Sequence, residues 1–389
     1  MLKLNEGSPG HWVIRIIWVA AVVAALVYIP TKTNTSTIGD IATATQLAIA
    51  AMSLNLLLGY SGVISIGHSA FFGIGGYTTA ILVSEYGWTQ GWTIYVAAAL
   101  AFVVGCIVSL PALRLKGVYL ALVTLALAVL FPTLVRWGKL AWLTNGAQGI
   151  SGIGYEQTPT WYNDHFARWQ FINESISLPE LRGREGRAIF LYWVGILILA
   201  VCYLVCRGIV KSRVGRSLIA IRDNETAAAV MGISRAKTKA LVFGTSAAMC
   251  AVGGCLYAIQ STLAEPNLRF FTLLGSITFL LIMVLGGAAT LWGPIVGAFA
   301  YVILDTRTRQ AGESGEGVIG WLFGWMTGSP ATLVLAIVLL IIVFVAPFGI
   351  VGLLKRIAAK FIVIIPRPAG TAPLPVSALE EPAVAGSPI

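Results

Sequence analysis

Long apolar runs recur along the whole chain, separated by short polar or glycine-rich connections. A helix needs about 20 apolar residues to cross the hydrocarbon core of a bilayer. Runs that approach this length fall at 12–29, 41–59, 63–83, 93–111, 118–135, 189–206, 240–260, 272–288, 291–304 and 329–346. The pattern therefore predicts an all-α fold, a polytopic transmembrane bundle of about ten helices.

Composition supports the same class. Hydrophobic residues make up 57% of the 389 residues and charged residues only 11%, whereas a soluble domain has about a quarter of its residues charged. The net charge of +10 lies mostly in the connections between apolar runs, which is typical of membrane orientation and not of nucleic-acid binding. We therefore expect membrane lipid, and no nucleic acid, as a partner.

The basic residues also predict an orientation, because Lys and Arg concentrate in cytoplasmic loops. The connection 207–239 holds eight of them: Arg207, Lys211, Arg213, Arg216, Arg222, Arg235, Lys237 and Lys239. With this connection in the cytoplasm, ten crossings place both termini there and the loops 136–188 and 305–328 outside. Residues 1–350 then form one transmembrane domain, and 351–389 form a cytoplasmic tail that should be largely disordered after 366, where Pro and Ala dominate.

Sequence features of a catalytic centre are missing. The chain contains no G-x-x-x-x-G-K-[ST] loop for ATP phosphates and no H-E-x-x-H motif, and it has only three histidines, His11, His68 and His165. Cys202 and Cys206 lie one helical turn apart without a His or carboxylate nearby, so packing is a better interpretation than a metal site. We expect no enzymatic activity, no metal and no cofactor bound by this chain.

The cytoplasmic connection contains a predicted short helix. Asp223 or Asn224 can cap its start, Glu225 places an acid in its first turn, and Gly232 supplies a left-handed stop. The small residues would let another protein approach closely beside Met231, and the arginines would supply ionic anchors. The candidate docking residues are Arg216, Arg222, Asp223, Asn224, Glu225, Ala227, Ala228, Met231 and Gly232. An ordinary solvated basic loop is the simpler alternative.

A second segment, GYSGVISIGHSAFFGIGGY at 59–77, is rich in glycine and serine within the membrane. It predicts a discontinuous helix, which is tolerated only where it is buried in protein or faces a water-filled cavity. The candidate residues of a translocation pathway are Asn55, Ser65, Gly67, His68 and Ser69. The alternative is that the small residues pack helices, with Asn55 and His68 as interhelical hydrogen-bonding groups.

A third segment, GGAATLWGP at 286–294, separates two apolar runs. It is either a tight turn or a hinge next to the cytoplasmic helix.

The segment SRVGRSLIAIRDNETAAAVMGI at 212–233 resembles the EAA coupling loop of ABC-transporter permeases, which has an acid, two alanines close behind and then a glycine. The acid is Glu225, the alanines are Ala227 and Ala228, and the glycine is Gly232. Further matching stretches are LLLGYSGVISIGHSAFFGIGGYTTAIL, LRLKGVYLALVTLALA, TNGAQGISGI and VLGGAATLWGPIVGA. Together they resemble permeases of branched-chain amino-acid (LIV) ABC uptake systems, the LivM-like subunit.

This resemblance implies a subunit of a bacterial inner-membrane importer. Its partners would be a second related permease, two cytoplasmic ATPases that hold ATP and Mg²⁺, and a periplasmic solute-binding protein. The short cytoplasmic helix would dock on an ATPase. The external loops 136–188 and 305–328 would be candidate surfaces for the binding protein.

Two alternatives stay open. A permease of the same machine could carry urea, short amides or small carboxylates. An ion-coupled secondary transporter is a different class, which would need buried acids or arginines. The predicted spans carry almost no buried acid, since Glu85 and Asp305 lie at their ends.

Overall fold

The computed structural model describes residues 2–5, 26, 28, 30, 33–114, 118–155, 183–314, 337, 341, 344 and 349–365. The chain divides into a large unit, Val27–Leu354, and a small one that joins Met1–Leu26 to Lys355–Ile389. The predicted crossing at 12–29 lies almost entirely outside the described residues, as does most of the one at 329–346.

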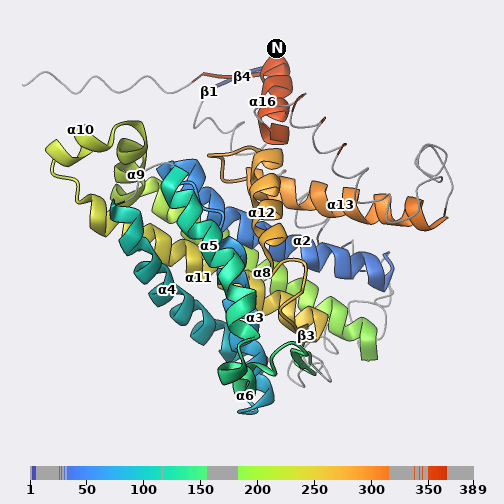
Figure 1. The fold of residues 1–389 in the computed structure, drawn as a ribbon. Coiled ribbons are helices and arrows are strands. Elements are labelled where there is room, and N and C mark those ends of the chain that lie inside the picture. The colour runs from blue at the N-terminus through green and yellow to red at the C-terminus, as the bar shows by residue number, and fades with distance from the viewer. Residues whose placement is uncertain are drawn as a thin grey trace, which may run out of the picture. The chain divides into compact units, whose positions relative to one another are not determined.

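Helices make up most of the described part of the large unit (Figure 1). Its first half contains α2 (Thr35–Leu54), a π-helical turn η1 (Asn55–Tyr60), α3 (His68–Ser84), α4 (Gln90–Arg114), α5 (Val118–Val135), the 3₁₀ turn η2 (Gly138–Leu140) and α6 (Ala141–Thr144). Its second half contains α8 (Gly183–Lys211), α9 (Arg213–Asp223), α10 (Glu225–Val230), α11 (Arg235–Ser261), α12 (Leu273–Gly286) and α13 (Gly293–Ser314). A two-stranded antiparallel ladder pairs β2 (Ile150–Ser151) with β3 (Leu263–Ala264).

The small unit has little regular structure among its described residues. Strand β1 (Leu2–Asn5) pairs in parallel with β4 (Ile362–Ile365), and the helix α16 (Gly349–Phe361) precedes β4 across the boundary between the units.

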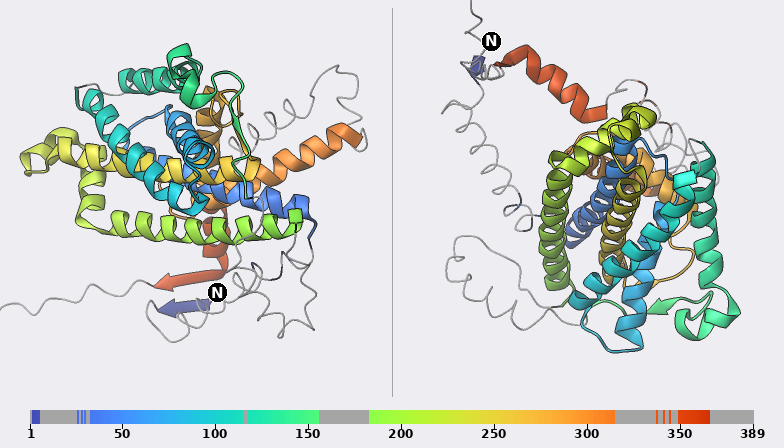
Figure 2. Two further views of the ribbon diagram at one scale, coloured as in Figure 1. Left: turned by 90° about the horizontal axis from the view of Figure 1, so that it is seen from below. Right: turned by 90° about the vertical axis from the view of Figure 1, so that its left-hand side faces the viewer.

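Two helices form the centre of the bundle. In α2, Leu47 to Leu54 are buried without a break, and α11 is buried along most of its length. The right-hand view of Figure 2 shows these two helices side by side within the bundle. The outer helices α4 and α8 instead expose large apolar side chains, such as Tyr95, Leu110 and Leu197. Apolar side chains on the outside of a bundle are what a lipid environment requires.

Among the described residues, four helices are long and apolar enough to cross a membrane: Thr35–Tyr60, Gln90–Pro111, Glu185–Lys211 and Arg235–Ser261. A fifth candidate is the pair Tyr119–Val135 and Gly138–Thr144, which is bent by 61°. The predicted all-α membrane bundle is confirmed at this level.

Several boundaries differ from the prediction. The run at 63–83 is helical only from His68, because an interruption precedes it. Helix α13 continues to Ser314, so residues 305–314 of the predicted external loop are helical. Helix α8 begins at Gly183, inside the predicted loop 136–188, of which residues 156–182 lie outside the described structure. The predictions place each helix end where the apolar run stops. A helix can continue beyond that point, because polar residues also form its backbone hydrogen bonds.

Candidate functional site

The connection between α8 and α11 folds into two short helices. Ser212 caps α9, because its Oγ accepts hydrogen bonds from the amides of Val214 (3.1 Å) and Gly215 (3.4 Å). The buried face of α9 repeats at a spacing of three residues: Gly215, Leu218 and Ile221. Arg213 and Arg216 are exposed, so α9 lies on the bundle with basic side chains facing away.

Helix α10 follows at once, with the predicted cap. The Oδ1 atom of Asn224 accepts hydrogen bonds from the amides of Thr226 (3.1 Å) and Ala227 (3.0 Å), while Asp223 ends α9. Gly232 has a φ of +80°, which L side chains rarely adopt, and so stops the helix as predicted.

Glu225, the acid of the predicted motif, forms ion pairs within the chain. Glu225 Oε1 accepts a hydrogen bond from Lys239 Nζ at 2.9 Å and lies 3.6 Å from Arg235 Nη1, both on α11. The Lys239 side chain is largely buried. Glu225 therefore connects α10 to α11 and stabilises the turn between the two helices.

The alanines of the motif have different surroundings. Ala228 is buried against the chain itself, whereas Ala227 is exposed. At the end of α10, Val230 and Met231 are 82% and 81% exposed, although both are large and apolar. These two adjacent side chains give the end of α10 a small exposed apolar surface.

Arg222 joins this segment to the membrane bundle. Its Nη1 donates to the carbonyl of Gly59 in η1 at 3.1 Å, and its Nε lies 3.2 Å from Asp223 Oδ1. Gly62 has a φ of +69°, and a Cβ there would come within 2.7 Å of Arg222 Cγ. The arginine therefore packs directly on the interruption that follows α2.

That interruption confirms the predicted discontinuous helix. Helical structure stops after Ser61 and resumes at His68, with Gly67 in the N-cap position of α3. Amides that a continuous helix would satisfy are bonded by side chains from other helices. The amide of Ile66 donates to Thr124 Oγ1 at 3.0 Å, and that of Ser69 donates to Ser276 Oγ at 2.8 Å.

His68 lies at the end of the interruption and is fully buried. Its Nδ1 is 3.1 Å from Ser65 Oγ, and its Nε2 is 2.9 Å from Ser246 Oγ. Ser246 also donates to the carbonyl of Ser53 at 2.7 Å. The imidazole thus connects α3 to both central helices.

Asn55 has a comparable role on the other side of the interruption. Its Nδ2 donates to the carbonyl of Thr290 at 2.8 Å, and its Oδ1 accepts from the amide of Ala289 at 2.8 Å. These backbone groups belong to the connection between α12 and α13. The structure therefore brings the interruption, the 287–292 connection and Arg222 together.

Some members of this arrangement were not predicted from sequence. Ser246, Ser276 and Thr290 each form a hydrogen bond with a candidate residue, and Thr124 accepts one from the amide of Ile66 between two candidates. Single polar residues within apolar runs are the available signal, because a hydroxyl in a membrane helix needs a partner.

Comparisons with known proteins agree on the family. The sequence model of the family described as "Branched-chain amino acid transport system / permease component" matches residues 36–346. The chain is 31% identical over 317 residues to the high-affinity branched-chain amino acid transport system permease protein LivM of Escherichia coli, covering 79% of this chain and 72% of that one.

The LivM protein of Salmonella typhimurium is 31% identical over 292 residues, covering 73% of this chain and 66% of that one. A probable branched-chain amino acid transport permease protein LivM from Methanocaldococcus jannaschii is 26% identical over 212 residues, or 54% of either chain. No solved structure matches the chain. The family match and the bacterial relatives show that the chain belongs to the permease components of branched-chain amino acid transport systems.

Proposed function

We propose that this chain forms half of the translocation pathway of an ATP-driven importer for branched-chain or other apolar amino acids. The chain is a non-catalytic transport subunit of the inner membrane. The cargo named for its relatives supports the proposed substrate. In the complete importer it would pair with a second related permease, two ATPases that bind ATP and Mg²⁺, and a periplasmic solute-binding protein. It would cross the membrane about ten times, with both termini in the cytoplasm.

Helix α10 is the proposed contact with the ATPase. Val230 and Met231 would insert into a cleft of that subunit, with Ala227 allowing close approach, because their exposed apolar surface gains most from leaving water. Asn224 and Gly232 fix the two ends of this helix, and Glu225 fixes its angle to α11.

The observation that carries the proposal is the hydrogen bond from Arg222 to the carbonyl of Gly59. Arg222 lies at the end of α9, directly before α10, and Gly59 lies in the turn that precedes the interruption. A displacement of α10 by the ATPase would therefore act on the interruption through one short link.

The interruption is the proposed moving part of the pathway. Asn55, Ser65, Gly67, His68 and Ser69 lie around it, in a region with fewer helical hydrogen bonds to break than a continuous helix would have. Exchange of the hydrogen bonds of His68 and Asn55 would accompany the change between outward and inward states.

The importer reconstituted in proteoliposomes tests this function. Leucine uptake should require ATP and should stop when the phosphate-binding lysine of the ATPase is replaced. It should persist when the proton gradient is collapsed with ATP present. Uptake driven by the gradient alone would instead support the secondary-transporter class.

Docking is tested on the same complex. Val230→Asp and Met231→Asp together should prevent copurification of the ATPase, because a buried carboxylate in the cleft is costly. Arg213→Asp is a matched control, since it places the same charge at an exposed position of the neighbouring helix α9, outside α10. If the double variant retains the ATPase as wild type does, α10 is not the docking helix.

A further inference from the structure

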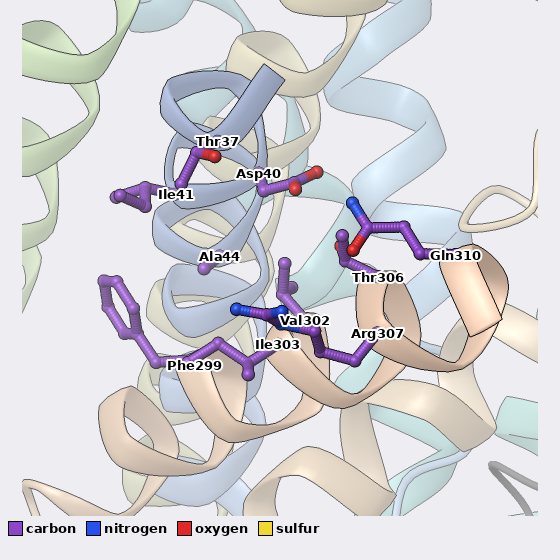
Figure 3. Close-up of a pocket in the computed structure, with 10 residues that line it drawn as sticks. All are labelled: Thr37, Asp40, Ile41, Ala44, Phe299, Val302, Ile303, Thr306, Arg307 and Gln310. Carbon is purple, nitrogen blue, oxygen red and sulfur yellow. The ribbon is translucent and has the colours of Figure 1, made fainter. Parts of the chain in front are cut away.

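A pocket of about 490 Å³ lies between α2 and α13, away from the interruption (Figure 3). Its volume falls within the roughly 300–1,000 Å³ of small-molecule sites. Its lining residues come from one face of each helix: Thr37, Asp40, Ile41, Ala44, Phe299, Val302, Ile303, Thr306, Arg307 and Gln310. Spacings of three and four residues place them in one stripe on each helix.

Polarity is sorted along this pocket. Its polar residues come from the N-terminal end of the α2 stripe (37 and 40) and the C-terminal end of the α13 stripe (306, 307 and 310). The apolar side chains come from the opposite ends, 41–44 and 299–303. A ligand with a charged head and an apolar tail would match both parts in only one orientation.

The pocket contains one acid and one base. The Asp40 carboxylate lies next to the Thr306 hydroxyl, and the Arg307 side chain extends back along α13, so that its guanidinium lies beside Val302 and Ile303 (Figure 3). Among the residues that the structure describes, neither Asp40 nor Arg307 forms an ion pair. The neighbouring Arg269 and Arg309, by contrast, both bind Asp305, with Nη1 and Nε at 3.0 Å from its Oδ2.

The pocket lies at the end of α2 opposite to the coupling segment. Asp40 precedes Tyr60 by 20 residues of helix, or about 30 Å along the axis. Figure 1 shows α10 and the start of α2 at opposite ends of the bundle. With α10 in the cytoplasm, the pocket faces the side from which a solute arrives.

From this arrangement we infer that the pocket between α2 and α13 binds a zwitterionic amino acid with a short apolar side chain on its way into the importer. Asp40 binds the α-ammonium group and Arg307 binds the α-carboxylate, while Ile41, Phe299 and Val302 surround the side chain. This assignment rests on the proposed function and adds a location to it.

A zwitterionic lipid has a similar head but a longer tail. The apolar part of the α13 stripe runs from Phe299 to Ile303, which is about 6 Å along the helix. An acyl chain extends through about 15 Å, half of the hydrocarbon core. The length of the apolar part therefore favours an amino-acid side chain.

Cysteine protection in the assembled importer, held in nanodiscs, tests the inference. Ile303→Cys and Thr37→Cys each place a thiol in the lining, where a maleimide can reach it. Leucine should slow the labelling of both. Leu274→Cys, an exposed position on α12 outside the pocket, should not be protected. Cys106 is replaced by Ser throughout, because the other native cysteines are buried.

Charge variants identify the groups that bind. Asp40→Asn and Arg307→Gln should each raise the half-protecting concentration of leucine by about tenfold or more, since a charged contact is lost. Arg213→Gln, an exposed arginine on α9 outside the lining, should leave it unchanged. Asp40→Asn should not weaken protection by 4-methylpentanoate, which lacks the amine, and Arg307→Gln should not weaken protection by leucinamide, which lacks the carboxylate.

The inference is overturned if leucine protects neither thiol, or protects them equally in all charge variants. It is also overturned if phosphatidylethanolamine in the nanodisc, and not leucine, gives the protection. ATP-dependent leucine uptake by the same preparation separates the two claims. Uptake without protection rejects only the pocket, whereas absence of uptake by the wild type rejects the proposed function.

Discussion

The interruption after α2 and the pocket between α2 and α13 both place polar groups in an apolar bundle, but their bonding differs. Around the interruption, His68 and Asn55 each use both of their polar side-chain atoms in hydrogen bonds within the chain, and three of these four bonds reach other segments. In the pocket, neither Asp40 nor Arg307 forms an ion pair within the described residues, although Arg309 lies close enough to attract the Asp40 carboxylate. Polar residues of the first kind hold the fold, and those of the second kind remain available to a ligand.

Replacement of Asn55 should cause the largest loss of stability. Asn55→Leu removes two hydrogen bonds, to the amide of Ala289 and to the carbonyl of Thr290, from a side chain that is buried. Each such bond contributes about 0.5–1.5 kcal/mol, so we expect the free energy of unfolding to fall by about 1–3 kcal/mol. Unfolding in mixed micelles measures this. An unchanged free energy of unfolding would show that the hydrogen bonds of Asn55 do not stabilise the fold.

Replacement of His68 should have a smaller effect on stability. His68→Ala removes the contacts to Ser65 and Ser246, and interhelical hydrogen bonds in membranes contribute about 0.6–2 kcal/mol. We expect assembly with the partner subunits to persist while the rate of uptake changes, because the interruption loses one of its attachments. Ser246→Ala is the matched control and should shift uptake in the same direction. Wild-type uptake kinetics in both variants would contradict this role.

The pocket charges should matter least for stability. Asp40→Asn and Arg307→Gln break no ion pair among the described residues, so we expect changes within about 0.5 kcal/mol. The same unfolding measurement checks this. If either variant lowers the free energy of unfolding as much as Asn55→Leu does, Asp40 or Arg307 stabilises the fold. The pocket would then not differ from the interruption in this respect.

Much of this arrangement could be predicted from the sequence. Apolar runs located eight of the helices, and cap residues located α10 from Asn224 to Gly232. The glycines and serines at 59–77 located the interruption. These are local properties, since each depends on residues within a turn or two along the chain.

The partners of these residues could not be predicted, because they are set by tertiary packing. Nothing in the sequence indicates that Arg222 would bond the carbonyl of Gly59, 163 residues away. The pocket was missed because Asp40 and Arg307 lie at the edges of their runs, where charged residues are ordinary. The helix α9 was missed because it is short and its apolar positions, such as Leu218 and Ile221, are flanked by the arginines that suggest a solvated basic loop.

Removing the hydrogen bond between Arg222 and Gly59 tests most directly whether the cytoplasmic segment is coupled to the interruption. Arg222→Ala removes this link but leaves Val230 and Met231 in place, so the ATPase should still bind. In proteoliposomes with the complete importer, we predict that ATP hydrolysis continues while leucine uptake per ATP falls at least about tenfold, the equivalent of roughly 1.4 kcal/mol of coupling. Unchanged uptake per ATP in this variant would contradict the account.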